Sequence, residues 1–149
     1  MAMTRGYAVG DPLPPLSKTM TQAAINLFEQ SGGKTGPSQF TDTETARDTL
    51  GTSGTVASGR MSVAFATELL RRYFGPELYN RTGMVELRFL RPARPGDTVT
   101  FNGKVTDIAK VTDGGRIGVE VTATNQKGDV TAVGAGACIV PSSFLPAEA

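Results

Sequence analysis

The sequence predicts an α+β protein, with helices in the first half of the chain and antiparallel strands in the second half. Apolar residues recur at helical spacing before residue 75 and at every second position after residue 80. The run 59–74 is apolar on most of its circumference, so this helix has to be buried, here within a curved sheet. With 149 residues, the chain is long enough to form one domain over 1–149.

Capping residues bound the predicted helices. Thr21 offers a hydroxyl N-cap to the first helix, and Thr41 with Glu44 matches a capping box at the start of the second. Glycines follow the helices, and Gly75-Pro76 ends the third. Three helices are predicted: the first begins after Thr21 and ends at residues 31–33, the second spans 43–50 and the third spans 59–74.

Strands are predicted where apolar and polar residues alternate. Asp113-Gly114-Gly115 indicates a hairpin between two of them, and the proline-rich segment 91–97 indicates a turn. Residues 1–15, which hold three of the prolines, predict an irregular arm before a short first strand. The predicted strands are 16–20, 84–89, 98–105, 117–124 and 130–140.

Composition excludes several classes of function. The 15 basic and 14 acidic residues nearly balance and form no basic cluster, which argues against a nucleic acid or an anionic membrane as partner. The single cysteine, Cys138, lies in an apolar run and indicates a buried residue in a reducing compartment. No stretch resembles a signal peptide or a membrane span, so we expect a soluble cytoplasmic protein. Without histidine, a metal site is not expected.

Three stretches resemble single-hotdog proteins of the MaoC-like family, which includes the (R)-specific enoyl-CoA hydratases and related acyl dehydratases. The first, Val9-Gly10-Asp11 through Thr21 followed by the short helix and Ser31-Gly32, resembles the family's entry segment. The second, Thr55-Val-Ala-Ser-Gly-Arg-Met61, is similar to the family's "I-A-H-G-M" helix start. The third, Glu86-Leu-Arg-Phe-Leu-Arg-Pro-Ala-Arg-Pro-Gly-Asp97, is similar to its "R-F-x-x-P-x-x-P-G-D" turn. Together they extend over most of residues 9–140.

The resemblance implies a long helix wrapped by a curved antiparallel sheet, in a homodimer or a heterodimer of two hotdog chains. It implies a CoA or acyl-carrier thioester as the substrate moiety, and no separate cofactor. Backbone N–H groups of Gly59 and Arg60, at the start of the long helix, would polarise the thioester carbonyl, because the first turn has unpaired donors and a positive dipole end. The alternative for Gly59 is a glycine required only for close helix packing.

The family's catalytic Asp/His pair is missing. Family hydratases carry approximately "S-G-D-x-N-P-x-H" after the first helix, whereas here Gly33 stands at the Asp position. The proline places Gln39 at the His position, and the downstream residues place Phe40 there instead. Ser58 replaces a histidine often found at the start of the long helix. None of these side chains accepts a proton at neutral pH.

Two carboxylates near this loop are candidate acid/base residues. Asp42 or Glu44 can serve as a base if burial raises its pKa. The alternative is that both stabilise the helix over 43–50, whose dipole favours negative charge at its start. Ser38 and Ser58 have no histidine to activate them, so a Ser/His nucleophile is excluded.

The remaining candidates are substrate-binding residues. Lys34 can contact a carboxylate or phosphate of a ligand, or remain solvated. In the family, the proline-rich turn lies near the phosphate end of CoA, so Arg91 and Arg94, with Arg88 beside them, are candidates to bind it, the alternative being a solvated face. The complete set of predicted substrate-binding residues is Lys34, Ser38, Gln39, Phe40, Ser58, Arg60, Arg91 and Arg94.

Three functions are consistent with these sequence features. The first is a hydratase or dehydratase acting on an enoyl or 3-hydroxyacyl thioester, or on a related small unsaturated carbonyl compound, with displaced acid/base residues. The second is a non-catalytic subunit that pairs with an active hotdog chain and shapes its acyl pocket. The third is a binding protein that uses the family's acyl pocket for a small apolar ligand.

Overall fold

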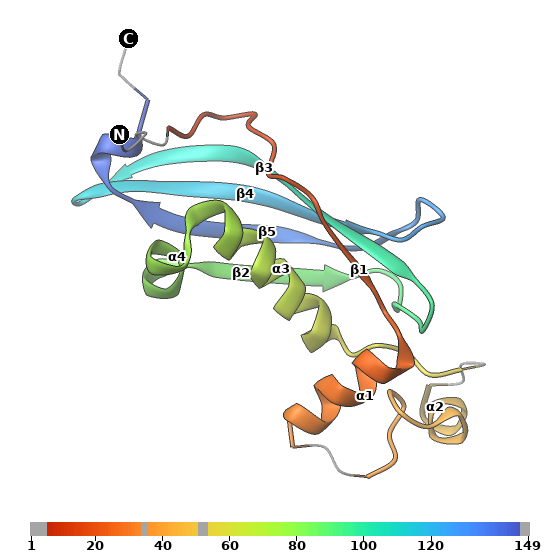
Figure 1. Ribbon diagram of the computed structural model, residues 1–149. Coiled ribbons are helices and arrows are strands. Elements are labelled where there is room, and N and C mark those ends of the chain that lie inside the picture. Colours follow the sequence, from red (N-terminus) through yellow and green to blue (C-terminus); the bar gives the residue numbers. More distant parts are fainter. Residues whose placement is uncertain (1–5, 34–35, 51–53, 147–149) are drawn as a thin grey trace.

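The computed structural model describes residues 6–33, 36–50 and 54–146. Apart from one short strand, helices come first and strands follow, as predicted (Figure 1). The helices are α1 (Gln22–Ser31), α2 (Thr43–Leu50), α3 (Gly59–Phe74) and α4 (Pro76–Thr82), with a 3-10 turn η1 (Ser142–Phe144) near the C-terminus. The strands are β1 (Leu16–Thr19), β2 (Met84–Phe89), β3 (Thr98–Val111), β4 (Gly114–Thr124) and β5 (Val130–Val140).

The five strands form one antiparallel sheet in the order β1-β3-β4-β5-β2. The predicted α+β class is therefore confirmed. β3 is six residues longer than predicted, and a register shift between Val105 and Asp107 interrupts its pairing with β4. Such a bulge bends a strand and increases its twist, which helps the sheet curve around α3. β1 and β2 are the two edges of the sheet.

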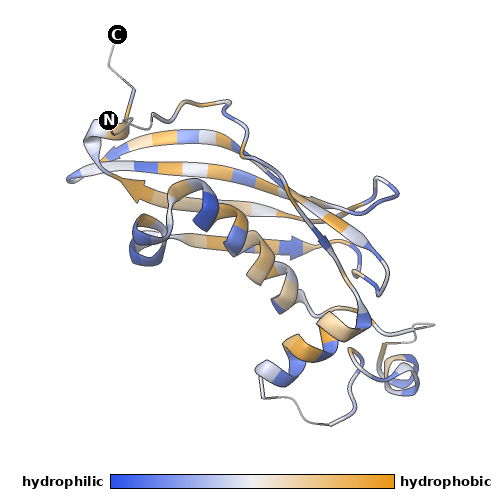
Figure 2. Cartoon of the chain, viewed as in Figure 1, coloured by the Kyte–Doolittle hydropathy of each residue, from blue (hydrophilic) through white to orange (hydrophobic). Residues whose placement is uncertain are grey.

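Helix α3 lies along the concave face of the sheet and fills it (Figure 1). Leu70 packs against β5 at Gly136, where a Cβ would lie only 2.5 Å from its Cδ1 atom. Figure 2 shows apolar and polar residues alternating along β3 and β4, which buries one face of each strand against α3. Fully buried members of this core are Ala66, Leu70, Val99, Phe101, Val105, Ile117, Val121 and Cys138.

The predicted hairpin joins β3 to β4, but its turn lies one residue earlier than the glycines suggested. Val111 pairs with Gly114, so Thr112 and Asp113 form the turn, and Asp113 has a φ of 67°. Asp tolerates this left-handed conformation better than most residues. The following glycines serve packing instead, because a Cβ at Gly114 would collide with the backbone of β5.

Helix α4 was not predicted from the sequence. Gly75-Pro76 ends α3 as expected, yet Pro76 also takes the first position of the next helix, where no N–H donor is required. Gly75, with a φ of 91°, turns the chain between the two helices. Tyr79 of α4 is buried and lies against Gly83, where no side chain stands in its way.

The N-terminal arm is irregular, as predicted, but its described part is bound to the sheet. Gly10 N–H donates to Val105 O and Leu13 N–H donates to Gly103 O, both on β3 and both at an N···O distance of 2.8 Å. Tyr7 is buried, and its ring contacts the rings of Tyr73 and Phe74 at the C-terminal end of α3. Among the described residues, no helix has the length and apolar character needed to cross a membrane.

Candidate functional site

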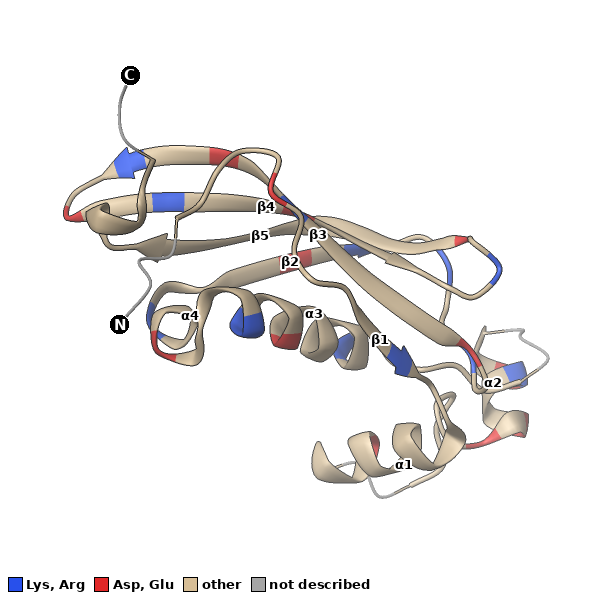
Figure 3. Ribbon diagram, turned by 45° about the horizontal axis from the view of Figure 1, so that its top comes forward, with Lys and Arg blue, Asp and Glu red and all other residues tan. Residues whose placement is uncertain are grey.

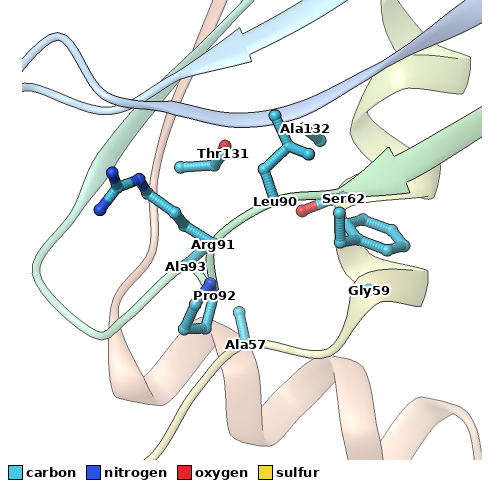
Figure 4. Close-up of a pocket in the computed structure, with 10 residues that line it drawn as sticks. Ala57, Gly59, Ser62, Leu90, Arg91, Pro92, Ala93, Thr131 and Ala132 are labelled. Carbon is cyan, nitrogen blue, oxygen red and sulfur yellow. The ribbon is translucent and has the colours of Figure 1, made fainter.

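A cavity of about 350 Å³ lies beside the first turn of α3, and we call it the α3 cavity (Figure 4). Three segments far apart in the sequence form it: the start of α3, the loop after β2 and the beginning of β5. The lining is mainly apolar and consists of Ala57, Gly59, Ser62, Phe89, Leu90, Arg91, Pro92, Ala93, Thr131 and Ala132. The two sequence motifs predicted to build a site, around 55–61 and 86–97, therefore meet here.

The N-terminus of α3 lies at this cavity, where Gly59 is a lining residue and Arg60 is not. Ser58 is the N-cap, and its hydroxyl accepts from the N–H of Met61 over 3.4 Å. This leaves the N–H groups of Gly59 and Arg60 without intrahelical partners, at the positive end of a 16-residue helix. Such donors suit a developing oxyanion. Ser58 itself serves as a helix cap, and its side chain is buried.

Phe89, which the sequence analysis did not select, covers Gly59. A Cβ at Gly59 would lie 2.8 Å from Cε2 of the Phe89 ring, so only glycine fits beneath the ring in this position. The Phe89 ring is 48% exposed and lies at the end of β2. The space above Gly59 is thus occupied by a side chain on the protein surface rather than by a packed helix.

Backbone hydrogen bonds hold the loop after β2 against the cavity. Ala57 N–H donates to Ala93 O over 2.7 Å, and Leu90 N–H donates to Thr131 O over 2.9 Å. Arg91 N–H donates to the same Thr131 carbonyl over 3.2 Å. The loop therefore connects the segment before α3 to β5, and it carries Arg91 at the rim.

Arg91 and Arg94 lie together, as predicted, around a second cavity of about 240 Å³, which we call the arginine cavity. Arg91 lines both cavities, and its side chain extends away from Gly59 (Figure 4). Lys127 joins them from the turn before β5, a contribution that its distant sequence position hides. Asp97 and Asp129 also line this cavity. Arg88 is separate from this group, because it lines a different hollow on β2, β4 and β5.

The loop before α2 holds the residues expected near the missing histidine. Ser38 Oγ accepts from Phe40 N–H over 3.2 Å, and Val56 N–H donates to Gln39 O over 3.2 Å. Phe40 packs against the hydrophobic core, and its carbonyl accepts from Gln22 Nε2 over 2.9 Å. Neither Gln39 nor Phe40 is among the residues that line the α3 cavity. Lys34 lies outside the described residues.

Asp42 caps α2, which corrects the expected capping box. Its Oδ2 accepts from Thr45 N over 2.8 Å and from Thr45 Oγ1 over 2.6 Å, whereas Thr41 Oγ1 accepts from Ser38 N. The hydroxyl of Thr45, and then its N–H, hold the pKa of Asp42 below its ordinary value. Glu44 is exposed in the first turn of α2. This geometry matches the helix-stabilising alternative for both carboxylates.

Glu29, on α1, is a further residue that sequence reasoning missed. Only 1% of it is exposed, its Oε2 lies 3.3 Å from Nη2 of Arg60, and its Oε1 has no hydrogen-bond partner within the described part of the chain. Glu29 also lines a third cavity of about 550 Å³, the α1 cavity, with Asn26, Gln30, Gly36, Pro37, Thr41 and Asp42. A signal was present in the sequence, because Glu29 follows Ile25 by four residues and thus lies on the apolar face of the helix.

Cys138 lies apart from these cavities. Cys138 is buried on β5, as expected, and burial raises the pKa of its thiol. Among the residues that the structure describes, no three His, Cys, Asp or Glu side chains come together as a candidate metal site.

The sheet wrapped around one long helix, with a cavity at the start of that helix, defines a hotdog-fold protein. The family model of the MaoC like domain matches residues 7–127, so the chain belongs to this family. A search of curated protein sequences finds no match.

Solved structures share this fold. A MaoC-like dehydratase from Rhodospirillum rubrum is 28% identical with a TM-score of 0.72, over 91% of this chain and 93% of that chain. The R-hydratase PhaJ1 from Pseudomonas aeruginosa, unliganded, is 22% identical with a TM-score of 0.72, over 91% and 83% of the two chains. The ChsH1–ChsH2 complex from Mycobacterium tuberculosis is 22% identical with a TM-score of 0.70, over 90% and 98%.

Proposed function

We propose that the chain binds an acyl thioester and catalyses hydration of an enoyl thioester or the reverse dehydration. The observation that carries this proposal is the opening of the α3 N-terminus into the α3 cavity. There, the thioester carbonyl accepts from the N–H groups of Gly59 and Arg60, and the part of the ligand that joins the thioester to the arginine cavity lies against the apolar lining. The positive helix end stabilises the enolate oxygen that forms when water adds to the double bond.

The arginine cavity suits the phosphates of CoA, or the single phosphate of an acyl-carrier arm. Arg91 lines both this cavity and the α3 cavity, so a ligand can extend from one to the other along its side chain. Arg94 and Lys127 add positive charge, and guanidinium groups bind phosphates by charge-assisted hydrogen bonds. Asp97 and Asp129 oppose this attraction, although Asp97 already accepts from Arg94 N and from Gln126 Nε2.

The acid/base chemistry differs from that of a hydratase with an Asp/His pair. With no histidine in the chain, a carboxylate is the available base. Asp42 and Glu44 remain candidates, but a carboxylate whose pKa is lowered, as that of Asp42 is, accepts a proton less readily at neutral pH. Turnover that survives in both Asp42→Asn and Glu44→Gln would remove these two residues as catalysts.

We also propose that the protein pairs through the edge strand β2. β2 has a partner strand on one side only. Three large apolar side chains are exposed along this edge: Met84 and Phe89 on β2, and Leu90 directly after it. A second hotdog chain, identical or different, would cover them and extend the sheet.

A second function is that of a non-catalytic subunit in a heteromeric hydratase. The missing histidine favours it, and ChsH1–ChsH2, a complex of two different chains, has the same fold. In this case the chain would shape the acyl pocket of an active partner and turn over little substrate alone.

Hydration of short and medium trans-2-enoyl-CoA by the purified protein, followed by loss of enoyl absorbance, tests the proposal. We expect turnover well above the uncatalysed rate. A folded protein that binds acyl-CoA without turnover would favour the subunit role, and co-expression with candidate partner chains would then restore activity. A folded protein that binds no thioester, but retains a small apolar ligand through purification, would favour the binding-protein alternative.

A further inference from the structure

Glu29 is the only charged residue in the described part of the chain that is buried to this degree. A buried carboxyl oxygen without a hydrogen-bond partner costs free energy, so native proteins rarely keep one unless a bound water, an ion or a catalytic role accounts for it. Here the ion pair with Arg60 satisfies only Oε2, while Oε1 remains unpartnered among the described residues. Because this inference names an acid/base residue for the hydratase proposed above, it rests on that function.

The fold brings this carboxyl close to the proposed thioester site. Arg60 is the second residue of α3, so Glu29 lies within one arginine side chain of the Gly59 and Arg60 N–H groups. The Arg60 guanidinium also approaches the end of α1, because its Nη1 would lie 3.7 Å from a Cβ at Gly32. Figures 1 and 3 both place α1 beyond the N-terminal end of α3, the end at which the unpaired N–H groups lie.

The α1 cavity, large enough for water molecules, has Glu29 in its wall. A neighbouring hydrogen-bond chain orients Asn26 in the same wall: Thr55 Oγ1 donates to Gln22 Oε1, and Gln22 Nε2 donates to Asn26 Oδ1 over 2.9 Å. Since its oxygen accepts this bond, the amide nitrogen of Asn26 is the group that can donate to a water or hydroxyl in the cavity.

We propose that the Glu29 carboxyl is the acid/base group of this chain and takes the place of the missing Asp/His pair. Its side chain turns toward the α1 cavity when substrate is bound, which breaks only the 3.3 Å contact with Arg60 among its described polar contacts. Water, held by Asn26, loses a proton to Oε1 while its oxygen bonds to C3 of the enoyl thioester. The electron pair of the C2–C3 double bond moves into the enolate, whose oxygen accepts from Gly59 and Arg60.

Glu29 then returns the proton to C2. The carbonyl re-forms, the carboxylate is regenerated, and one water has been added across the double bond. Dehydration follows the same steps in reverse, so neither direction requires an oxidant, a reductant or a further co-reactant.

Glu29→Gln tests the proposal, with hydration of a trans-2-enoyl-CoA and affinity for the saturated acyl-CoA as the two measurements. We expect kcat to fall by about 10²–10⁴-fold, the usual contribution of a general acid/base group, with acyl-CoA affinity unchanged. The exposed Glu77→Gln is the matched control and should retain the wild-type kcat. An E29Q variant with kcat within a few-fold of wild type would overturn the assignment and leave the proposed function standing. A wild-type protein inactive on every thioester would overturn both.

Two further variants separate chemistry from structure. Glu29→Asp keeps the charge but shortens the side chain and so moves the carboxyl away from the substrate. We expect kcat to fall at least about tenfold with folding intact. A wild-type kcat in E29D would contradict the proposal, and this test holds even if E29Q fails to fold. Arg60→Met removes the ion pair but keeps the carboxylate and the backbone N–H, so we expect a raised KM with most of kcat retained. An R60M variant that loses as much kcat as E29Q would overturn the proposal and make Glu29 a positioning residue acting through Arg60.

Discussion

Gly59 and Phe89 together decide how closely a ligand approaches the backbone at the start of α3. The absence of a side chain at Gly59 leaves room for one group above the first-turn N–H donors, and the exposed Phe89 ring occupies that room here. Phe89 does not belong to the hydrophobic core of the chain, so a thioester can displace its ring without disturbing that core.

Gly59→Ala should therefore weaken binding more than folding. The new methyl group would lie 2.8 Å from the Phe89 ring and beside the N–H donors. Gly59 is the first residue of α3, so alanine gains less there than the about 1 kcal/mol that it gains over glycine in a helix interior. The ring that it displaces lies outside the hydrophobic core, so we expect a Tm near that of the wild type. Affinity for saturated acyl-CoA should fall about tenfold in a titration. Phe89→Ala, which keeps Gly59, is the control and should lose less; wild-type affinity in G59A would contradict this role.

Arg91→Ala and Arg94→Ala should each weaken CoA binding about tenfold at low salt. A hydrogen bond to a charged group is worth about 1.5–3 kcal/mol, and a factor of ten in affinity corresponds to about 1.4 kcal/mol. The effect should shrink as salt is added, because salt screens exposed charges. Arg88→Ala removes an arginine that lies outside the arginine cavity and is the matched control. Unchanged dissociation constants in R91A and R94A would remove the phosphate-binding role.

Asp42→Ala should destabilise the protein in a pH-dependent way. The folded-state pKa of Asp42 is lowered from its ordinary value of 3.8, so the unfolded chain binds the proton more readily than the native state does. The stabilisation is therefore complete above about pH 4 and is lost as the pH falls through the lowered pKa. We expect a lower Tm for D42A than for wild type at pH 7 and a smaller difference at pH 3; equal Tm values at pH 7 would contradict the cap.

At the scale of the elements, the fit of α3 into the sheet depends on one glycine of β5. Gly136→Val would drive a side chain into Leu70 of α3. Overpacking a core of this kind costs about 1–3 kcal/mol, so denaturant unfolding should show a clear loss of stability. Ala135→Val introduces the same valine side chain at an exposed neighbouring position and should change stability little. A G136V variant as stable as A135V would show that α3 adjusts at this contact.

Local sequence signals predicted most of the elements, because helix caps and strand alternation act over a few residues. The bounds of α2, α3, β2 and β5 are confirmed, as is the Thr21 cap of α1. α4 was not predicted because Gly75-Pro76 is typical of a helix end, and here the same two residues also begin the next helix. The extra length of β3 depends on pairing with β4, and no pattern within β3 alone contains that information.

The candidate site was predicted where it rests on a contiguous motif and missed where it rests on tertiary contacts. Gly59 and Arg91 belong to motifs, and both line the α3 cavity. Glu29, Phe89 and Lys127 come to the cavities only through the packing of α1, the end of β2 and the turn before β5. In each case the partner lies about 30 residues or more away along the chain, as with Glu29 and Arg60.

At the scale of the whole molecule, the exposed apolar side chains along β2 predict a dimer in solution. Met84→Lys places a charge on this edge and should raise the dissociation constant of the dimer, measured by light scattering across a concentration series. Val130→Lys, on an exposed apolar residue of β5, is the control and should leave the dimer intact. A wild-type protein that is monomeric at every concentration would contradict pairing with a second copy and favour a heteromeric partner.

The proposed binding of a thioester carbonyl at the start of α3 can be tested directly, whether or not the chain turns over substrate. Amide ¹H–¹⁵N spectra of the labelled protein, recorded during titration with a saturated acyl-CoA, report each backbone N–H separately. The proposed thioester site predicts downfield shifts of the Gly59 and Arg60 amide protons, which saturate together with the amide shifts of the residues that line the arginine cavity. Saturable binding that shifts residues elsewhere and leaves these two amides unchanged would contradict it.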